Sequence, residues 1–295
     1  MSDLSFDGRV AIVTGAGRGL GRAYALLLAA RGARVVVNDL GGSTAGDGAD
    51  AEPAESVAEE IRAAGGQAVA DTHDIATPAG GQAVVETAID RFGRIDVVVN
   101  NAGIVRWGAL PDVEPADLER HLAVHLMGSF HTTRAAWPHL VAQRYGRVVL
   151  TTSSGLFGLA NNLSYAAAKA GLIGLARSAK LAGEPHGITA NLIAPAARTR
   201  MAGDGPGPDL PSEAVAPMVA VLAHESCPVS GEVYTAGAGR FARLFIASTP
   251  GYLHTGSPVT PEDVAGNWAA INDETGYFVP ADLLGWSREF LRHLR

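Results

Sequence analysis

The sequence predicts an α/β fold, a doubly wound parallel sheet of about seven strands with helices on both faces. Short apolar runs alternate along the chain with stretches of helical pattern. The runs are nearly continuous, which is typical of strands buried on both faces of a parallel sheet. Repeated strand, helix, strand units favour a doubly wound arrangement. The predicted strands are residues 10–14, 34–39, 67–72, 95–100, 147–152, 188–193 and 232–237.

Two segments interrupt this alternation, and a third follows it. Residues 40–53 are polar and rich in glycine and alanine, which is typical of a long loop or a disordered segment. Residues 196–211 contain three prolines and three glycines, and we expect a mobile loop there. Residues 1–245 are predicted to form one domain. Residues 246–295 are predicted to be a C-terminal extension packed on it, because about fifty residues make a poor independent core.

The composition argues against several classes of protein. The 295 residues carry a formal net charge of -7 and no basic block, so nucleic acid is not an expected partner. No run of about 18 apolar residues occurs, so no membrane span is expected. The N-terminus shows no secretory signal, and the last residues, RHLR, are not a peroxisomal address. Because the single cysteine, Cys227, cannot form an internal disulfide, we expect a cytoplasmic protein.

A glycine-rich loop follows the first predicted strand. Residues 14–21 read TGAGRGLG, with the spacing T-G-x-x-x-G-x-G. Backbone N–H groups at the start of a helix bind anions, and a pyrophosphate fits such a site. Glycine lets the chain turn and lets ligand and helix approach the sheet closely. The alternative is that the glycines only punctuate a turn. The cofactor-binding residues predicted in this loop are Gly15, Arg18, Gly19, Leu20 and Gly21.

An acidic residue, Asp39, follows the second predicted strand, 18 residues after Gly21. An acid at this place accepts both hydroxyls of an adenosine ribose in dinucleotide-binding sheets of the Rossmann type. It also repels a 2′-phosphate, so it predicts NAD rather than NADP as the cofactor. Arg18 favours the opposite choice, because an arginine in this loop can pair with that phosphate. Residues 40–53 would then lie over the cofactor edge of the sheet, or be disordered.

Four further motifs stand in a fixed order along the chain. They are NNAG at 100–103, TTSS at 151–154, YAAAK at 165–169 and IAP at 193–195. With the glycine loop, they make residues 8–240 resemble the short-chain dehydrogenase/reductase family. Other stretches resemble the (3R)-hydroxyacyl-CoA dehydrogenase part of peroxisomal multifunctional enzymes. These stretches are VVVNDLGG, FGRIDVVVNNAGI, VHLMGSFHTTRAAW, HESC and PVTPEDVAGNW.

The resemblance implies that Tyr165 and Lys169 are catalytic. Oxidation of an alcohol needs a base, and a free tyrosine, with a pKa of about 10, is a poor one near neutrality. Tyr165 and Lys169 are four residues apart, so they share one face of a helix, and a nearby ammonium lowers the pKa of a tyrosine. Lys169 can also reach the nicotinamide ribose. A surface Tyr and Lys on an amphipathic helix is the alternative, which the order of the motifs disfavours.

The resemblance also implies a hydroxyl that holds the substrate oxygen, just after the fifth predicted strand. The usual spacing to the tyrosine points to Thr152, whereas counting from the strand points to Ser153, and Ser154 is also possible. We predict Ser153. His125 stands where many family members have an asparagine that holds a water, so it either has that role or packs between helices. His121 and His125 have helical spacing without a third ligand, and no metal is predicted.

The same resemblance implies further residues at the cofactor. NNAG would bring its backbone to the adenosine ribose, Asp74 and Ile75 would meet the adenine edge, and the segment after IAP would meet the nicotinamide carboxamide. Asp74 can equally be a helix cap. Trp107 either shapes the substrate mouth with residues 196–211 or is an ordinary packing residue. The additional cofactor residues are Asp74, Ile75, Asn101, Ala102, Gly103, Pro195, Ala196 and Thr199.

The function implied is NAD-dependent oxidation of a secondary alcohol, with a (3R)-3-hydroxyacyl-CoA as the expected substrate. The alternatives are a 17β-hydroxysteroid dehydrogenase, a 3-oxoacyl carrier-protein reductase and a non-catalytic dinucleotide sensor on the same fold. Family members are usually homodimers or homotetramers that pair through the helix with the tyrosine. Leu172, Leu175 and Ala179 are compatible with that pairing and equally with burial against the sheet.

Overall fold

The computed structural model describes residues 4–202, 210–256 and 258–294, and its chain divides into two compact units. The first unit is Met1–Arg243 and the second is Leu244–Arg295. The boundary lies close to the predicted one, whereas packing of the second unit on the first stays a prediction. Residues 203–209 of the predicted 196–211 loop lie outside the described part of the chain.

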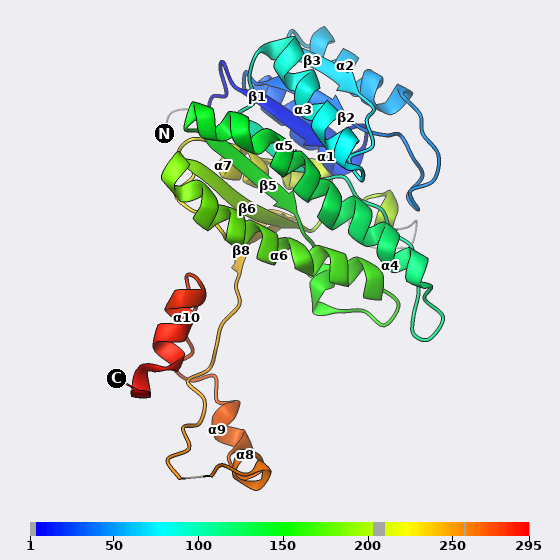
Figure 1. Ribbon diagram of the computed structural model, residues 1–295. Helices are drawn as coiled ribbons and strands as arrows, with labels where there is room; N and C mark the ends of the chain where they lie inside the picture. Colours follow the sequence, from blue (N-terminus) through cyan, green and yellow to red (C-terminus); the bar gives the residue numbers. More distant parts are fainter. Residues whose placement is uncertain (1–3, 203–209, 257, 295) are drawn as a thin grey trace. The chain divides into compact units, whose positions relative to one another are not determined.

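The first unit is built around a mostly parallel eight-stranded sheet with the order β3-β2-β1-β4-β5-β6-β7-β8 (Figure 1). The strands β1 to β7 pair in parallel, so the loops that follow them meet at one edge. The order reverses between β1 and β4, the place where doubly wound sheets bind ligands. The strands are β1 Val10–Thr14, β2 Arg34–Asn38, β3 Gln67–Asp71, β4 Val97–Asn100, β5 Gly146–Thr151, β6 Ile188–Pro195, β7 Val233–Gly237 and β8 Arg240–Leu244.

The eighth strand, β8, is an addition to the predicted sheet. A two-residue turn, Ala238–Gly239, joins it to β7, and both residues have positive φ, of 51° and 73°. Such a turn is typical of a tight β-hairpin. Since β8 is an edge strand and none of its residues is fully buried, it lacks the continuous apolar run by which the other strands were predicted.

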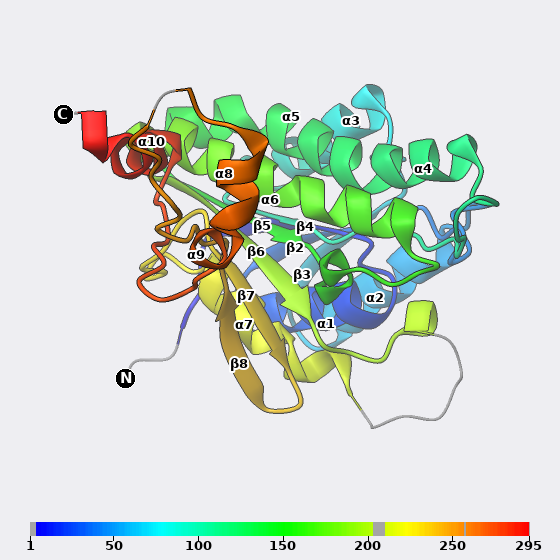
Figure 2. The same cartoon turned by 90° about the horizontal axis from the view of Figure 1, so that it is seen from below.

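Helices cover both faces of the sheet (Figure 2). The helices α1, α2 and α7 lie on one face, and α3, α5 and α6 lie on the other, with α4 next to α6. A turn of π-helix, η1, joins α4 to α5. The helices of this unit are α1 Gly19–Ala30, α2 Glu52–Ala63, α3 Pro78–Phe92, α4 Pro115–His121, η1 Leu122–Met127, α5 Gly128–Gln143, α6 Leu163–Gly183 and α7 Ala216–Ala223. Short 3-10 turns complete the connections at η2 Ser154–Phe157, η3 Glu184–His186, η4 Arg200–Ala202 and η5 Ser212–Ala214.

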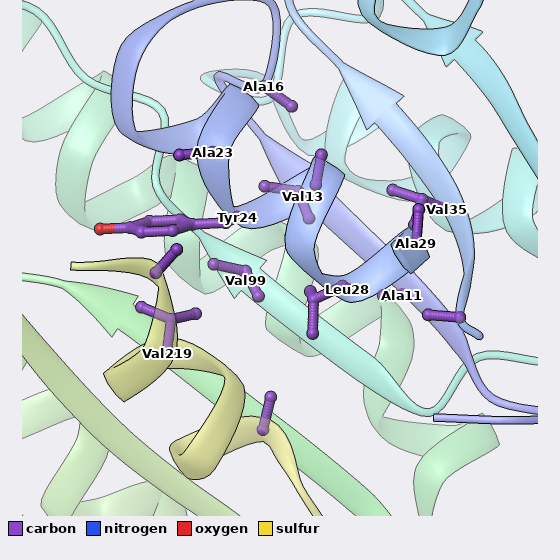
Figure 3. Packing of buried hydrophobic residues seen from close by; sticks show 14 of the residues in the cluster. Ala11, Val13, Ala16, Ala23, Tyr24, Leu28, Ala29, Val35, Val99 and Val219 are labelled. Atoms are coloured by element: carbon purple, nitrogen blue, oxygen red, sulfur yellow. The ribbon is translucent and has the colours of Figure 1, made fainter. Parts of the chain in front are cut away.

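The core under α1 positions the glycine loop. Figure 3 shows α1 lying across β1, β2 and β4, with α7 beside it. Alanines such as Ala23 and Ala29 let the helix approach the valines of the strands closely. Tyr24 is fully buried in this layer, and its hydroxyl has no hydrogen-bond partner among the described residues. Packing of this kind fixes where the first turn of α1 meets the sheet edge.

The second unit consists of three short helices and a 3-10 turn, α8 Pro261–Gly266, α9 Trp268–Ile271, α10 Leu283–Phe290 and η6 Arg292–Leu294. Thr260 and Asp263 form a capping box at α8, because each side chain accepts the backbone N–H of the other. None of the described residues in this unit is buried, as expected for a segment too short to form its own core. No helix in the described ranges is both long and apolar enough to cross a bilayer.

Candidate active site

The glycine loop brings the start of α1 against the loop that follows β4. Gly15 has φ of +64°, and a Cβ atom there would lie 2.7 Å from the Cα of Ala102. A Cβ atom at Gly21 would collide with the carbonyl oxygen of Gly15. No side chain caps the N-terminus of α1 at Arg18, and its first turn holds no acid. The first N–H groups of this twelve-residue helix therefore remain available to an anion, as the sequence predicts.

Asp39 follows β2 at the sheet edge and ties two loops together. Its carboxylate accepts a hydrogen bond from the backbone N–H of Gly17 at 2.8 Å and from that of Gly41 at 2.7 Å. The two bonds fix the carboxylate beside the glycine loop. Each carboxylate oxygen can accept a further bond, so the group remains able to receive ribose hydroxyls.

One cleft of about 550 Å³ gathers the predicted cofactor residues, a volume typical of sites for small molecules. Asp74 also lines it, and its side chain accepts from the N–H of Ala76, while Thr77 is the N-cap of α3. The alternative in which Asp74 caps the helix is therefore wrong. The predicted cofactor residues that line the cleft are Gly15, Arg18, Gly19, Leu20, Gly21, Asp39, Asp74, Ile75, Asn101, Ala102, Gly103, Tyr165, Lys169, Pro195, Ala196 and Thr199.

Helix α6 presents Tyr165 and Lys169 at the same end of this cleft. The Nζ atom of Lys169 lies 5.6 Å from the centre of the Tyr165 ring and donates to the carbonyl oxygen of Thr151 at 2.6 Å. Both side chains are largely removed from water, Lys169 being 4% exposed. The helical spacing thus places the pair on one face, as expected.

Among the three hydroxyls after β5, Ser153 is the one that meets Tyr165. The Ser153 hydroxyl is hydrogen-bonded to the Tyr165 side chain and accepts from the N–H of Gly155 at 3.0 Å. Thr152 instead donates to the carbonyl oxygen of Lys169 at 2.8 Å, and the exposed Ser154 begins η2. The geometry therefore favours Ser153 as the hydroxyl next to the tyrosine.

Burial controls the protonation of both residues. It raises the pKa of Tyr165 above its usual value, and the hydrogen bond from Ser153 only partly offsets this. Burial also lowers the pKa of Lys169 to about 7. Burial raises the pKa of Tyr165 in the protein alone, and a lowering of that pKa by an adjacent ammonium stays a prediction.

His121 and His125 form a stacked pair beside the tyrosine. Their ring centres are 5.8 Å apart, and the His125 ring meets the Tyr165 ring edge to face at 5.3 Å. His121 Nδ1 lies 2.6 Å from the carbonyl oxygen of Asp117, and Nε2 accepts from the N–H of Arg106 at 3.2 Å. His121 is therefore neutral with its proton on Nδ1, since a carbonyl only accepts and an N–H only donates.

His125 is fully buried, and its Nε2 atom lies 2.8 Å from the carbonyl oxygen of Ile104. Its Nδ1 atom has no partner among the described residues. A Cβ atom at Gly103 would lie 3.0 Å from this Nδ1, so glycine is needed there for the ring to fit. Burial and the nearby Lys169 hold the pKa of His125 well below its usual value. Nε2 also accepts from the N–H of Ile104 at 3.2 Å, so His125 packs between elements and keeps one unpaired ring nitrogen, Nδ1, next to the tyrosine.

Several residues of the cleft have no sequence signal that we recognised. Gly42, Ser43, Thr44 and Gly46, from the loop after β2, line it opposite Ile104 and Arg120. That loop has a defined conformation and lies at the cofactor edge. It therefore agrees with the expectation that residues 40–53 lie over this edge, and not with the expectation that they are disordered. The described residues contain no group of three His, Cys, Asp or Glu side chains that would hold a metal ion. Trp107 also lines the cleft, with 53% of it exposed.

Comparison with known proteins supports the resemblance seen in the sequence. Residues 9–204 match the family described as short chain dehydrogenase. The chain belongs to the short-chain dehydrogenase family. It is 46% identical over 279 residues to the peroxisomal multifunctional enzyme type 2 of Drosophila melanogaster, covering 92% of this chain and 46% of the relative. The structure of that full-length enzyme superposes with a TM-score of 0.83 at 36% identity, over 99% of this chain and 50% of that chain.

Two further relatives bear on the short-chain dehydrogenase chemistry. A short-chain type dehydrogenase/reductase of Mycobacterium tuberculosis is 46% identical, with 91% of this chain and 95% of the relative covered. A 7α-hydroxysteroid dehydrogenase complexed with NADH and a 7-oxo bile acid superposes with a TM-score of 0.73 at 29% identity, covering 81% of this chain and 98% of that chain. The chain spans about half the length of the Drosophila relative. The family to which the chain belongs is one of oxidoreductases.

Proposed function

We propose that the protein is an NAD-dependent dehydrogenase that interconverts a (3R)-3-hydroxyacyl-CoA and the 3-oxoacyl-CoA. The observation that carries the catalytic part is the meeting of Ser153, Tyr165 and Lys169 at one end of a cleft whose other end is lined by the glycine loop and Asp39. The acyl-CoA part rests on the likeness to multifunctional enzyme type 2 over most of the chain.

The residues present fit a nicotinamide dinucleotide. The uncapped start of α1 suits the pyrophosphate, and only glycine at positions 15 and 21 leaves the close approach that the loop makes. Asp39 favours NAD over NADP, because a carboxylate accepts ribose hydroxyls and repels a 2′-phosphate. Arg18 lines the same cleft and is the residue that argues for NADP. We therefore propose NAD on the strength of Asp39.

In the proposed mechanism, Tyr165 receives the proton of the substrate hydroxyl. The bound oxidised dinucleotide supplies the hydride acceptor for the carbon that bears the hydroxyl. The Ser153 hydroxyl holds the substrate oxygen, and the Tyr165 phenolate accepts the hydroxyl proton as the ketone forms. The buried Lys169, with a pKa of about 7, takes up or releases a proton readily near neutrality. In this proposal the unpaired Nδ1 of His125 hydrogen-bonds a water that carries the proton onward.

The rival functions differ in substrate or in turnover. A 17β-hydroxysteroid dehydrogenase or a 3-oxoacyl carrier-protein reductase uses the same catalytic groups, and a 3-oxoacyl carrier-protein reductase of Synechocystis is 39% identical over 63% of this chain. A biosynthetic reductase of that kind normally prefers NADPH, which Asp39 disfavours. A dinucleotide sensor would bind NADH without turnover, against which the Tyr165 and Lys169 pair argues.

The experiment follows loss of NADH absorbance with a 3-oxoacyl-CoA, with the same acyl group on a carrier protein and with a 17-ketosteroid. We expect rapid oxidation with the CoA thioester. Activity with the steroid alone would move the protein to the hydroxysteroid dehydrogenases, and activity with the carrier-protein thioester alone would make it a biosynthetic reductase. NADH binding without turnover of any of the three would favour the sensor.

The cellular location also belongs to this proposal. The Drosophila and yeast relatives are named as peroxisomal enzymes, whereas the sequence features predict a cytoplasmic location for this chain. A cytoplasmic location stays a prediction, and imaging of a fluorescently tagged full chain in its native cell tests it.

A further inference from the structure

An ordered strap crosses the edge of the cleft between β2 and α2. We use the term strap for residues 40–51 and tip for residues 43–47. The strap is closed on itself by the N–H of Asp50, which donates to the carbonyl oxygen of Leu40 at 2.9 Å, and by the N–H of Ser43, which donates to the carbonyl oxygen of Asp47 at 2.9 Å. Its base is held by Asp39 through Gly41. The strap therefore begins at the residue proposed to bind the ribose.

The tip reaches across to the segment that follows β4. The N–H of Val105 donates to the carbonyl oxygen of Thr44 at 2.8 Å. The Nη2 atom of Arg120 donates to the carbonyl oxygen of Gly46 at 3.2 Å. Because residues of the tip also line the cleft, the strap forms a wall that runs from Asp39 to Val105.

Arg106 makes the largest number of polar contacts to this tip. Its Nε atom donates to the carbonyl oxygen of Ala45 at 2.8 Å, and its Nη2 atom donates to the carboxylate of Asp47 at 2.9 Å. The Nη1 atom donates to Asp117 on α4 at 3.3 Å, so the guanidinium joins the tip to the helix. The backbone of Arg106 is itself held from the interior by His121. Arg106 is thus a fixed anchor, and its side chain does not line the cleft.

The strap depends on these bonds to stay closed. None of its residues is buried, and it contains four glycines, so hydrophobic packing contributes little to holding it. A segment with few buried apolar contacts opens at low cost unless polar contacts hold it. The bonds from Arg106 include a charged pair and a charge-assisted bond to a carbonyl, the stronger kinds of protein hydrogen bond.

We propose that Arg106 is a positioning residue that holds the strap closed along the dinucleotide cleft and thereby slows dissociation of the dinucleotide. The proposal rests on the proposed function, because it takes the cleft to bind NADH. It assigns Arg106 no part in the chemistry. An enzyme whose strap is released should bind NADH more weakly, mainly through faster dissociation, because an open wall no longer obstructs departure.

The test measures NADH dissociation by stopped-flow fluorescence, and amide hydrogen exchange of the strap in the protein without NADH. For Arg106→Met we expect dissociation about five to ten times faster, a factor comparable to the loss of one ordinary hydrogen bond. We also expect faster exchange at Ser43, Asp50 and Val105. Arg62→Met is the matched control, because Arg62 pairs with Glu55 and Glu59 on α2 and does not touch the strap. It should leave both measurements unchanged.

A second variant, Gly46→Ala, changes the strap itself and not its anchor. Gly46 has φ of +86°, and a Cβ atom there would lie 2.9 Å from the Cγ2 atom of Ile104, so Gly46→Ala should lift the tip while leaving Arg106 intact. We expect Gly46→Ala, like Arg106→Met, to speed both NADH dissociation and amide exchange of the strap. NADH dissociation and strap exchange within twofold of wild type in both variants would overturn the inference. Failure of the wild-type protein to bind NADH would instead refute the proposed function.

Discussion

Asp39 shows how one side chain can take part both in recognition and in structure. Its two oxygens hold the glycine loop through Gly17 and the strap through Gly41. Sequence alone predicted the acid at this place, because its distance from the glycine loop follows from strand and helix lengths. The two backbone bonds could not be predicted, since they depend on how the glycine loop and residues 40–53 fold.

For Asp39→Ala we predict a loss of preference for NADH. Removing the carboxylate removes the repulsion of a 2′-phosphate and leaves Arg18 free to pair with it, so the ratio of kcat/KM for NADH to that for NADPH should fall by about tenfold or more. The measurement is initial rates with both cofactors. Affinity for NADH should also fall, since the strap loses its hold at Gly41. An unchanged ratio would mean that Arg18 or the strap decides the cofactor.

The two directions of the reaction should respond differently to pH. Alcohol oxidation needs the Tyr165 phenolate, and because burial raises the pKa of Tyr165 above 10.0, the phenolate fraction should grow throughout the range from pH 7 to 9. Ketone reduction needs the protonated tyrosine and should not gain from alkaline pH. Profiles of kcat/KM in both directions check this.

The Ser153→Ala variant tests the same explanation, because its pH profile of alcohol oxidation can be compared with that of the wild type. It removes the hydrogen bond that lowers the pKa of Tyr165, so the oxidation profile should move to higher pH in addition to losing rate. A profile that keeps its midpoint in this variant, or wild-type oxidation that does not rise above pH 7, would contradict the proposed protonation of Tyr165.

At the scale of elements, the strands were predictable and the connections were not. Buried parallel strands are continuous apolar runs, so β1 to β7 lie within two residues of their predicted ranges. The edge strand β8 lacks a continuous apolar run, and the strap is held by hydrogen bonds to residues far from it in the sequence. The π-turn η1, which brings His125 beside Tyr165, likewise has no periodic signal in the sequence.

The packing of α1 against α7 leads to a stability prediction. The hydroxyl of Tyr24 is buried without a partner among the described residues, and burial raises the pKa of Tyr24. For Tyr24→Phe we predict a gain of about 1 kcal/mol in the free energy of unfolding, or about 2–4 °C in Tm, because the unpaired hydroxyl is costly to bury. Thermal unfolding measures this. Tyr277→Phe, at a half-exposed tyrosine of the second unit, should leave Tm unchanged, and a loss of stability in Tyr24→Phe would show that the hydroxyl has a partner.

At the scale of the whole molecule, the assembly state is a prediction that the sequence made by resemblance. Of the three residues on the predicted face of α6, Leu172 is buried, whereas Leu175 and Ala179 are only partly buried. We expect a homodimer or homotetramer of the 30.4 kDa chain, measured by light scattering after size-exclusion chromatography. For Leu175→Glu we expect a smaller assembly, because a charge would enter the predicted α6 contact. A wild-type monomer would contradict this expectation.

The central claim is that this cleft oxidises and reduces its substrate through Tyr165. The most direct measurement compares wild type and Tyr165→Phe in the same preparation, following NADH oxidation with a 3-oxoacyl-CoA and NADH binding by fluorescence. We expect a loss of turnover of at least about a hundredfold, the usual scale for an acid–base group, with NADH affinity changed only a few-fold. A Tyr165→Phe enzyme that turns over at the wild-type rate would contradict it.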